Sequence, residues 1–202
     1  MSKLFQTLYR LKKSDLNKAS ITLFNAFHDD PFANVFIPSK AGRVRYFIPL
    51  LKFFTKYGLK YGEVISTSKI INDISILYKL KNVKTSIFKA LLSGYIKFQR
   101  RVSKEVINRV KYAVPELEKT HASIINTPHW YLNFIAVDPK FQGKGHGTTL
   151  LKNMLRQIDI DGLSCYLETW VKKNVEWYQK YDFKVMKEIV LFDCQGWAML
   201  RG

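Results

Sequence analysis

The sequence lacks the features that define several protein classes. Its 202 residues include two cysteines, Cys165 and Cys194, without CxxC spacing and without a cluster of histidines. We therefore expect neither a disulfide framework nor a metal site, but two reduced, mostly buried thiols. No apolar run reaches the roughly 18 residues that a membrane span needs. The opening segment MSKLFQTLYRLKK has no long apolar core typical of an export signal, so we expect a soluble, cytoplasmic protein.

Acidic residues are also scarce, since 16 Asp and Glu face 33 Lys and Arg, which gives a net charge of +17. The excess is concentrated between Lys79 and Lys111, where ten basic residues and the single acid Glu105 give a local net charge of +9. A charge of this size raises nucleic acid, an anionic membrane or an anionic ligand as partners. The simpler interpretation is the solvated face of a helix, because most charged runs are exposed surfaces.

Length and composition predict one mixed α/β domain spanning residues 1–202, because 47% hydrophobic content suffices for one substantial core. Hydrophobic periodicity predicts a short strand at Leu8–Leu11, a helix capped by Ser14, and a second helix over Val44–Tyr57 that Pro49 starts or kinks. A hairpin is expected from Glu63–Thr67 and Ile71–Lys79. An inserted basic segment at about 84–125 should hold one helix with an apolar side and a second near Val106–Thr120; the apolar side comprises Ile87, Leu91, Leu92, Tyr95, Ile96 and Phe98.

The last third of the chain has the clearest pattern. A strand at Tyr131–Val137, a helix at Thr148–Ile158 and a strand at Leu163–Thr169 predict a parallel strand pair with a crossover helix. Three glycines, Gly143, Gly145 and Gly147, fall at the turn from the first strand into the helix. Backbone N–H groups without intrahelical partners point outward at such a turn, and the helix dipole favours an anion. The turn is therefore a candidate phosphate site.

The spacing of the glycine turn excludes GxxxxGK[ST], and GxGxxG would need its third glycine one position after Gly147. The stretch VDPKFQGKGHGTTLL instead resembles the acetyl-coenzyme A motif of the GNAT superfamily of N-acetyltransferases. CYLETWVKKNVEWYQKYDF is similar to the family's second strand and following helix, with Tyr178 five residues before Phe183. HWYLNFIAVDP, AFHDDPFANVFIP and the closing WAML look most like the puromycin N-acetyltransferase-like branch. Asp182 stands where the family usually has glycine.

The resemblance implies a GNAT acyl-CoA N-acyltransferase fold, in which a mostly antiparallel sheet contains one splayed parallel pair between flanking helices. It implies acetyl-CoA as co-substrate and an amine as acceptor. Tyr178 would protonate the leaving thiolate, and Asn174 would cap its helix, contact the pantetheine arm, or both. The residues expected to bind the coenzyme are Ile135, Ala136, Val137, Gln142, Gly143, Lys144, Gly145, His146, Gly147, Thr148, Asn174 and Tyr178.

The general base is assigned from strand alternation. Glu168 shares the more polar face of its strand with Ser164 and Tyr166, so it is expected to point into the cleft, although a structural hydrogen bond is almost as well supported. His129 is the rival candidate, but a lone histidine beside a proline is more typical of a loop. His146 is expected to face solvent or to lie near phosphate.

Three lysines are candidates for contacts with the coenzyme's phosphates, with solvated surface as the equal alternative. They are Lys140, Lys144 and Lys172.

Two other function classes remain open at this point. In one, the domain binds acetyl-CoA as a regulatory module, because Asp182 spoils the placement of Tyr178. In the other, the basic segment binds nucleic acid or a membrane surface on a GNAT scaffold. The identity of the acceptor and the oligomeric state are not readable from these motifs.

Overall fold

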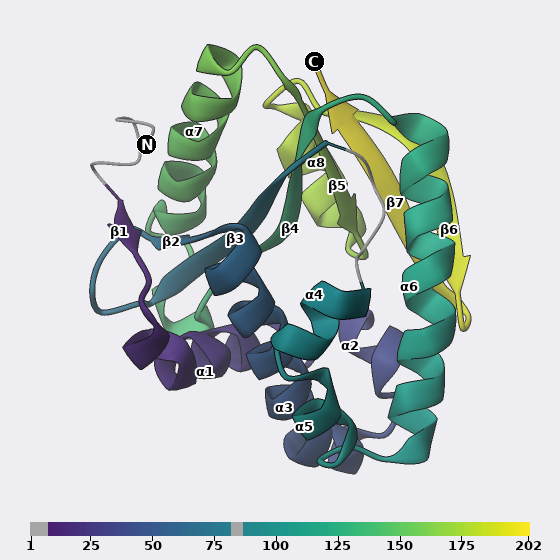
Figure 1. The fold of residues 1–202 in the computed structure, drawn as a ribbon. Helices are drawn as coiled ribbons and strands as arrows, with labels where there is room; N and C mark the ends of the chain where they lie inside the picture. Colours follow the sequence, from purple (N-terminus) through teal and green to yellow (C-terminus); the bar gives the residue numbers. More distant parts are fainter. Residues whose placement is uncertain (1–7, 82–86) are drawn as a thin grey trace.

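A single sheet of seven strands runs through the protein in the order β1-β2-β3-β4-β5-β7-β6 (Figure 1). The structure, a computed structural model, describes residues 8–81 and 87–202, with the backbone alone for residues 87–89. Within these residues, every neighbouring pair is antiparallel except β4 and β5, which are parallel. The strands are β1 (Tyr9–Arg10), β2 (Glu63–Ser66), β3 (Asp73–Leu80), β4 (His129–Val137), β5 (Ser164–Thr169), β6 (Lys184–Leu191) and β7 (Cys194–Arg201). The predicted mixed α/β class and the parallel pair are confirmed.

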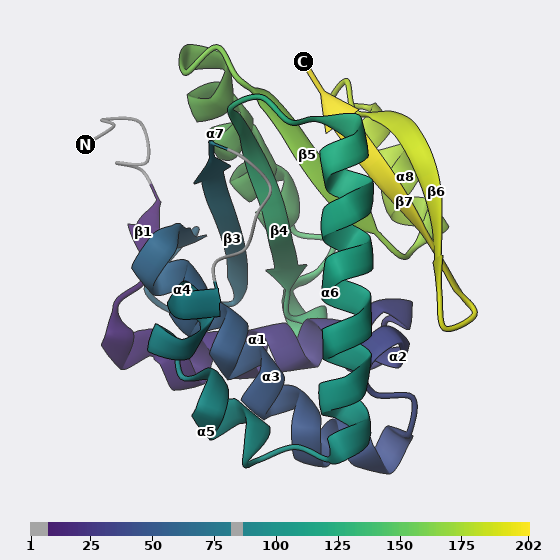
Figure 2. The same ribbon diagram turned by 45° about the vertical axis from the view of Figure 1, so that its right-hand side comes forward.

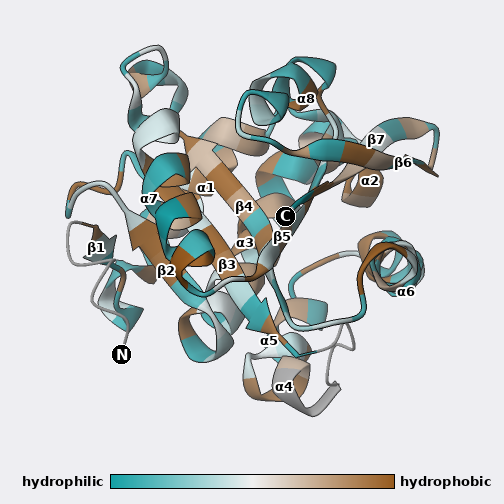
Figure 3. Ribbon diagram, turned by 90° about the horizontal axis from the view of Figure 1, so that it is seen from above, coloured by the Kyte–Doolittle hydropathy of each residue, from teal (hydrophilic) through white to brown (hydrophobic). Residues whose placement is uncertain are grey.

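Helices cover both faces of this sheet. In Figure 3, α6 and α7 lie on opposite sides of the central strands, and hydrophobic residues are concentrated on β2, β3 and β4 between them. One core cluster joins the sheet to α1, α3 and α6, and the other joins it to α7 and α8. The helices are α1 (Leu16–Phe27), α2 (Pro31–Phe36), α3 (Lys40–Tyr61), α4 (Ile87–Leu92), α5 (Tyr95–Gln99), α6 (Lys104–Ile124), α7 (His146–Ile160) and α8 (Lys172–Gln179), with short 3-10 turns η2 (Lys13–Asp15) and η3 (Pro139–Phe141).

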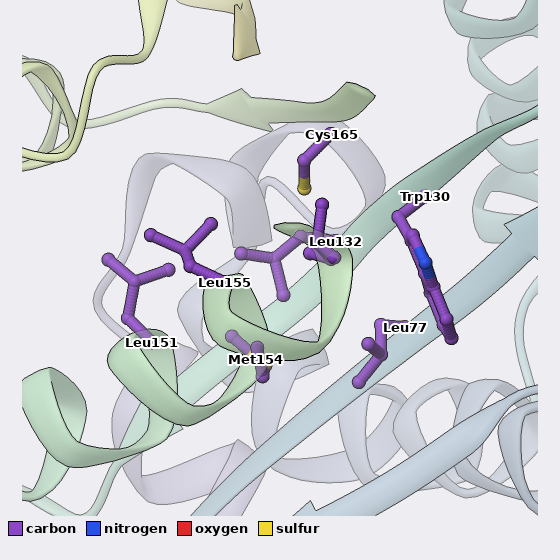
Figure 4. Close-up of a pocket in the computed structure, with 8 residues that line it drawn as sticks. Leu77, Trp130, Leu132, Leu151, Met154, Leu155 and Cys165 are labelled. Carbon is purple, nitrogen blue, oxygen red and sulfur yellow. The ribbon is translucent and has the colours of Figure 1, made fainter. Parts of the chain in front are cut away.

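The crossover helix α7 shows how periodicity fixes packing. Its predicted apolar face is buried in full, and fully burying each of these side chains contributes about 1.5–3 kcal/mol. Figure 4 shows side chains of α7 facing Leu77, Trp130 and Cys165 from strands β3, β4 and β5. Burial raises the pKa of the Cys165 thiol to about 12, so this cysteine is an unreactive core residue, and both cysteines are free. The buried face of α7 consists of Leu150, Leu151, Met154, Leu155 and Ile158.

Two local predictions are wrong. Ser14 lies inside η2, and Asp15 takes the N-cap position of α1; the Asp15 carboxylate accepts the Lys12 N–H at 2.7 Å and so caps η2. Pro49 does not start a helix, because it lies inside α3, which leaves the alternative of a kink. The single basic helix is two short ones, because Gly94 has φ +96° and separates α4 from α5.

The apolar side predicted for the basic segment is only partly buried. Tyr95 and Phe98 pack on the core, whereas Leu91, Leu92 and Ile96 are 44%, 51% and 51% exposed. The split into two helices turns these side chains away from the sheet. The side chain of Ile87 lies outside the described residues.

Helix α3 approaches the β2–β3 hairpin closely at Gly58. A Cβ atom there would lie 2.7 Å from Ile76 Cγ2 and 2.9 Å from Val64 Cγ2, both on buried strand side chains. Replacing a mid-helix glycine with alanine ordinarily stabilises a helix by about 0.5–1 kcal/mol. At Gly58 the close contact with Ile76 and Val64 outweighs this gain in helix stability.

We therefore predict that Gly58→Ala lowers the free energy of unfolding by about 1–3 kcal/mol, because overpacking forces the helix away from the hairpin. Urea unfolding followed by circular dichroism measures this change. A variant as stable as the parent, or more stable, would contradict the close approach.

Candidate active site

The glycine turn between β4 and α7 has the geometry of an anion site. Gly143 and Gly145 have φ +76° and +83°, and Gly145 is the N-cap of the 15-residue helix α7. A Cβ atom added at either glycine would meet nothing within 4 Å, so this side of the turn faces open space. The N–H groups at the start of α7 lack intrahelical partners, and the helix dipole adds a partial positive charge there. A phosphate group fits this arrangement.

His146 fixes the glycine turn to the sheet, contrary to the expectation that it faces solvent or phosphate. Its Nδ1 lies 2.7 Å from Oδ2 of the fully buried Asp73, at the start of β3. Asp73 also accepts hydrogen bonds from Ser66 Oγ at 3.0 Å and from the backbone N–H and the hydroxyl of Thr67. The buried carboxylate thus joins the β2–β3 connection to the first residue of α7. His146 therefore positions the turn through Asp73.

Strands β4 and β5 pair over only four residues each, from His129 opposite Ser164 to Leu132 opposite Leu167. Beyond Leu132, β4 continues to Val137 with β3 as its partner on one side, while β5 continues to Thr169 with β7 as its partner. A bulge at Asn133 marks the divergence, because Leu132 is opposite Leu77 and Phe134 opposite Ile76. The predicted splay is confirmed, and Ile135, Ala136 and Val137 lie on its open edge.

Tyr178 lies in the second turn of α8 and is 5% exposed. Its ring packs edge-to-face on Phe183 with centroids 5.5 Å apart, and it lies 4.9 Å from the ring of Trp177. Burial raises the pKa of the Tyr178 phenol, and the nearby Cys165 and Asp30 act in the same direction. The phenol therefore keeps its proton at neutral pH, as a general acid must.

Asp182 adopts φ +67°, a left-handed conformation that glycine adopts freely and that aspartate tolerates better than most other residues. The following Phe183 is 1% exposed and in contact with Tyr178.

Glu168 is the first residue of β5 beyond the part paired with β4, so its carboxylate lies where the strands diverge. Burial raises the pKa of this carboxyl to about 7, although the neighbouring hydroxyls of Tyr131 and Tyr166 favour the charged form. A carboxylate that titrates near neutrality is suited to general base catalysis. Glu168 thus lies where the strands diverge and carries a carboxyl with a raised pKa.

Asp30, which the sequence analysis missed, is a second carboxylate at the divergence. It is the N-cap of α2, where Oδ1 accepts the Phe32 N–H at 2.8 Å, and burial raises its pKa. The charge of Asp30 also raises the pKa of the Tyr178 phenol, so the two side chains lie near each other. The signal available in the sequence was the DDP stretch, which is typical of a helix N-cap and says nothing about a cleft.

His129 is buried at the start of β4 and is not a loop residue. Its Nδ1–H donates to the Thr127 carbonyl at 2.6 Å, and its Nε2 lies 2.8 Å from Nε2 of His121 on α6. Burial lowers the pKa of both imidazoles, that of His121 to about 3. Two neutral histidines that hold α6 against the sheet do not supply a catalytic base.

The other predicted binding residues lie on the surface or in the turn after β4. Asn174 is exposed and lies third in α8, so it does not cap this helix, whose N-cap is Val171. Gln142 Nε2 donates to the Val137 carbonyl at 3.1 Å and closes the turn after β4. Lys140, Lys144 and Lys172 are exposed.

The basic segment is only partly a solvated face. Arg109 of α6 donates to the Asn34 and Val35 carbonyls of α2 at 3.4 and 3.3 Å, and its guanidinium lies 4.3 Å from the ring centroid of Phe192. Lys79 pairs with Asp161 at 2.8 Å. The other exposed cations of this segment are Lys81, Lys97, Arg100, Arg101, Lys104 and Lys111, while the side chains of Lys84 and Lys89 lie outside the described residues.

Comparison with known proteins agrees with this geometry. Residues 104–185 match the family model described as an acetyltransferase (GNAT) domain. An uncharacterized N-acetyltransferase of Schizosaccharomyces pombe is 27% identical over 190 residues, which covers 90% of this chain and 76% of the relative. Over residues 104–185 the chain is therefore similar to GNAT acetyltransferase domains.

Solved structures show the same fold at low sequence identity. Arylalkylamine N-acetyltransferase 2 from Aedes aegypti superposes with a TM-score of 0.67 at 15% identity, covering 96% of this chain and 97% of that protein. A Corynebacterium glutamicum protein described as histone acetyltransferase HPA2 and related acetyltransferase gives 0.65 at 17% identity, covering 96% and 94%. At such identities the likeness shows the fold alone.

Among the described residues no helix is long and apolar enough to cross a membrane.

Proposed function

We propose that the protein transfers an acetyl group from acetyl-CoA directly to a primary amine. The observation that carries the proposal is the divergence of β4 and β5 after Leu132 and Leu167, with the glycine turn at the end of one strand and Glu168 on the other. A thioester arm that enters this opening from the glycine turn would place its carbonyl beside Glu168. The proposal also keeps the chain in the puromycin N-acetyltransferase-like branch, on the residues quoted for that resemblance.

The residues present fit the coenzyme. The turn from Gln142 to Thr148 offers outward backbone N–H groups and open space for a pyrophosphate. The edge of β4 at Ile135, Ala136 and Val137, which has no β5 partner, would receive the pantetheine arm. Acetyl-CoA, when bound, supplies the acetyl group as a thioester.

Two side chains, Glu168 and Tyr178, carry out the two proton transfers of the proposed reaction. Depriving an amine of pKa ~10 of its proton costs about 4 kcal/mol at pH 7, so a base beside the amine lowers the barrier. Glu168, with its pKa of about 7, accepts this proton directly or through water. Tyr178 would return a proton to the leaving thiolate, because its phenol is protonated at neutral pH. A free backbone N–H on the edge of β4 would stabilise the oxyanion.

The glycine turn is tested by adding a side chain and a negative charge where phosphate is proposed. Gly145→Asp should weaken acetyl-CoA binding about tenfold or more, because the new carboxylate would repel the phosphate. Two like charges ~4 Å apart repel each other by on the order of 1–4 kcal/mol, depending on the local dielectric constant. Isothermal titration calorimetry measures the affinity.

Gly162→Asp is the matched control, since Gly162 has φ +63°, also faces open space and lies in the turn after α7. It imposes the same backbone strain but should leave the affinity for acetyl-CoA unchanged. Equal affinities of the two variants would refute the phosphate site.

Tyr178→Phe tests the general acid. The ring keeps its packing on Phe183, so stability should change little, while kcat should fall about 10²-fold with little change in coenzyme affinity. Steady-state kinetics with a free-thiol readout at saturating coenzyme gives kcat. A near-normal kcat would assign Tyr178 to packing alone.

Glu168→Gln tests the general base by pH dependence. In the parent, kcat should rise as pH increases through about 7, because the carboxylate accepts a proton only when ionised. The variant should lose this rise and turn over about 10²-fold more slowly above pH 8. If the rise persists in Glu168→Gln, the base is another group, and Asp30→Asn is then the variant to compare.

A further inference from the structure

Helix α6 buries a polar side chain against the sheet, beside the strand that carries Glu168. Figure 2 shows α6 running alongside β4 and β5 on the face that α1 and α3 also cover. The residues that α6 buries are Val106, Val110, Ala113 and His121. His121 is 3% exposed, and a buried polar group is costly unless it is hydrogen-bonded. Packing alone would be served at lower cost by another apolar residue.

Two hydrogen bonds fix the orientation of the His121 ring. The Nδ1–H of His129 donates to the Thr127 carbonyl at 2.6 Å, so Nε2 of this neutral imidazole is an acceptor. Nε2 of His121 lies 2.8 Å from that acceptor and therefore carries the proton of the bond between the two rings. Burial lowers the pKa of both imidazoles, that of His121 to about 3, so both are neutral at neutral pH. The backbone just before β4 thus orients a side chain of α6.

The oriented ring packs on two tyrosines of the sheet. The rings of His121 and Tyr166 form a face-to-face stack, with planes 9° apart and centroids 3.6 Å apart. His121 also meets Tyr131 edge-to-face, with centroids 5.0 Å apart. Tyr131 and Tyr166 are opposite each other in the parallel register, and their centroids are 5.7 Å apart. One side chain of α6 therefore restrains both tyrosine rings.

Strand geometry brings these two tyrosines to Glu168. Glu168 is two residues after Tyr166 on β5, so the two side chains share one face of the strand, roughly 6.6 Å apart along it. Tyr131 lies on the same face, because it is opposite Tyr166. Both hydroxyls act as hydrogen-bond donors to the Glu168 carboxylate and favour its charged form. The placement of the two phenols therefore affects how readily Glu168 holds a proton.

Other elements add little charge around Glu168. Strand β7 presents Ala198 opposite it. Within residues 8–81 and 87–202, no Lys, Arg or His side chain forms an ion pair with its carboxylate. The ionisable groups that surround Glu168 are Tyr78 of β3, His129 and Tyr131 of β4, Tyr166 of β5 and His121 of α6, with Asp30 of α2 and Tyr178 of α8 at the opening.

We propose that His121 is a positioning residue for the general base, and that it acts by holding the hydroxyls of Tyr131 and Tyr166 against the Glu168 carboxylate. The inference rests on the proposed function and adds a residue to the same site. His121 stays neutral and does not touch the reacting atoms. Its effect is on the pH at which Glu168 becomes a base, because the two hydroxyls offset part of the cost of burying the charged carboxylate.

The first test removes the His121 ring and keeps a hydrogen-bond donor. In His121→Gln the side-chain amide can still donate to Nε2 of His129, but the stack on Tyr166 is lost. The pKa of Glu168 should rise by about one unit, because a loosened phenol gives up much of a hydrogen bond to a charged group. The rise of kcat should move to higher pH by the same amount.

Carbon-13 NMR of the glutamate carboxyl groups measures the pKa of Glu168 without any turnover. The signal of Glu168 is assigned by its loss in Glu168→Gln. An unchanged pKa of Glu168 in folded His121→Gln would overturn the proposal.

His121→Phe is the conservative counterpart, because it keeps a flat ring on Tyr166 and Tyr131 but cannot donate to His129. The pKa of Glu168 should stay close to that of the parent. The free energy of unfolding should fall, because Nε2 of His129 is left buried without its donor. A merely structural histidine would lower stability in both variants and move the pKa in neither. A pKa shift as large in His121→Phe as in His121→Gln would rule out the stack as the cause.

Tyr166→Phe tests whether the effect passes through this phenol. The single variant should raise the pKa of Glu168 at least as much as His121→Gln does. The double variant should raise it no further, because changes that act through one shared group are not additive. Additive shifts would contradict the proposal.

Arg109→Gln is the matched control, because Arg109 is the other anchor of α6, on the carbonyls of α2 and the ring of Phe192. It should lower stability and leave the pKa of Glu168 unchanged. A shift equal to that of His121→Gln would reduce the effect to a loosened helix and refute the assignment to His121.

Failure of the proposed function looks different from failure of this inference. In the first case acetyl-CoA releases no thiol with any amine, or the rise of kcat persists in Glu168→Gln. The carboxyl titration still shows in that case whether His121 sets the pKa of Glu168. The thiol assay therefore decides the function, and the titration decides the contribution of His121.

Discussion

The short pairing of β4 with β5 is the constraint on which the rest of this structure depends. Parallel strands that pair over four residues and then separate cannot be stabilised by their ladder alone, so other contacts must hold each strand beyond the divergence. Strand β4 relies on β3 and α7, and β5 relies on β7 and α8. The opening between them exists because both strands have a second neighbour that keeps them in place.

Helix α6 connects parts of the chain that the sheet leaves separate. Near its start, Arg109 contacts α2 and the β6–β7 hairpin at Phe192. Near its end, His121 stacks on Tyr166 with ring centroids 3.6 Å apart and meets His129 at the start of β4. These two anchors set the position of α6 relative to Glu168. The basic segment thus contributes structure at Arg109 and His121 as well as exposed charge.

Periodicity predicted the elements whose residues repeat on one face. The buried side of α7, the β2–β3 hairpin and the parallel pair follow from local pattern, because burial selects apolar residues at the helical or strand period. The local sequence pattern did not predict the environment of a side chain whose contacts are with residues far away in the sequence. His146 looked solvent-facing because its partner Asp73 is 73 positions earlier. The sequence around Asp30 indicates only a helix cap, because its neighbour Tyr178 is 148 positions later in the chain.

The location of α6 in the chain has an evolutionary consequence. Residues 104–124 stand between β3 and β4, upstream of the glycine turn, and their contacts with the sheet are on the face opposite α7. Substitutions on this helix can therefore accumulate while Gly145, Asp73 and Tyr178 keep their surroundings. Such changes leave the glycine turn intact as long as Arg109 and His121, the two anchors of the helix, are retained.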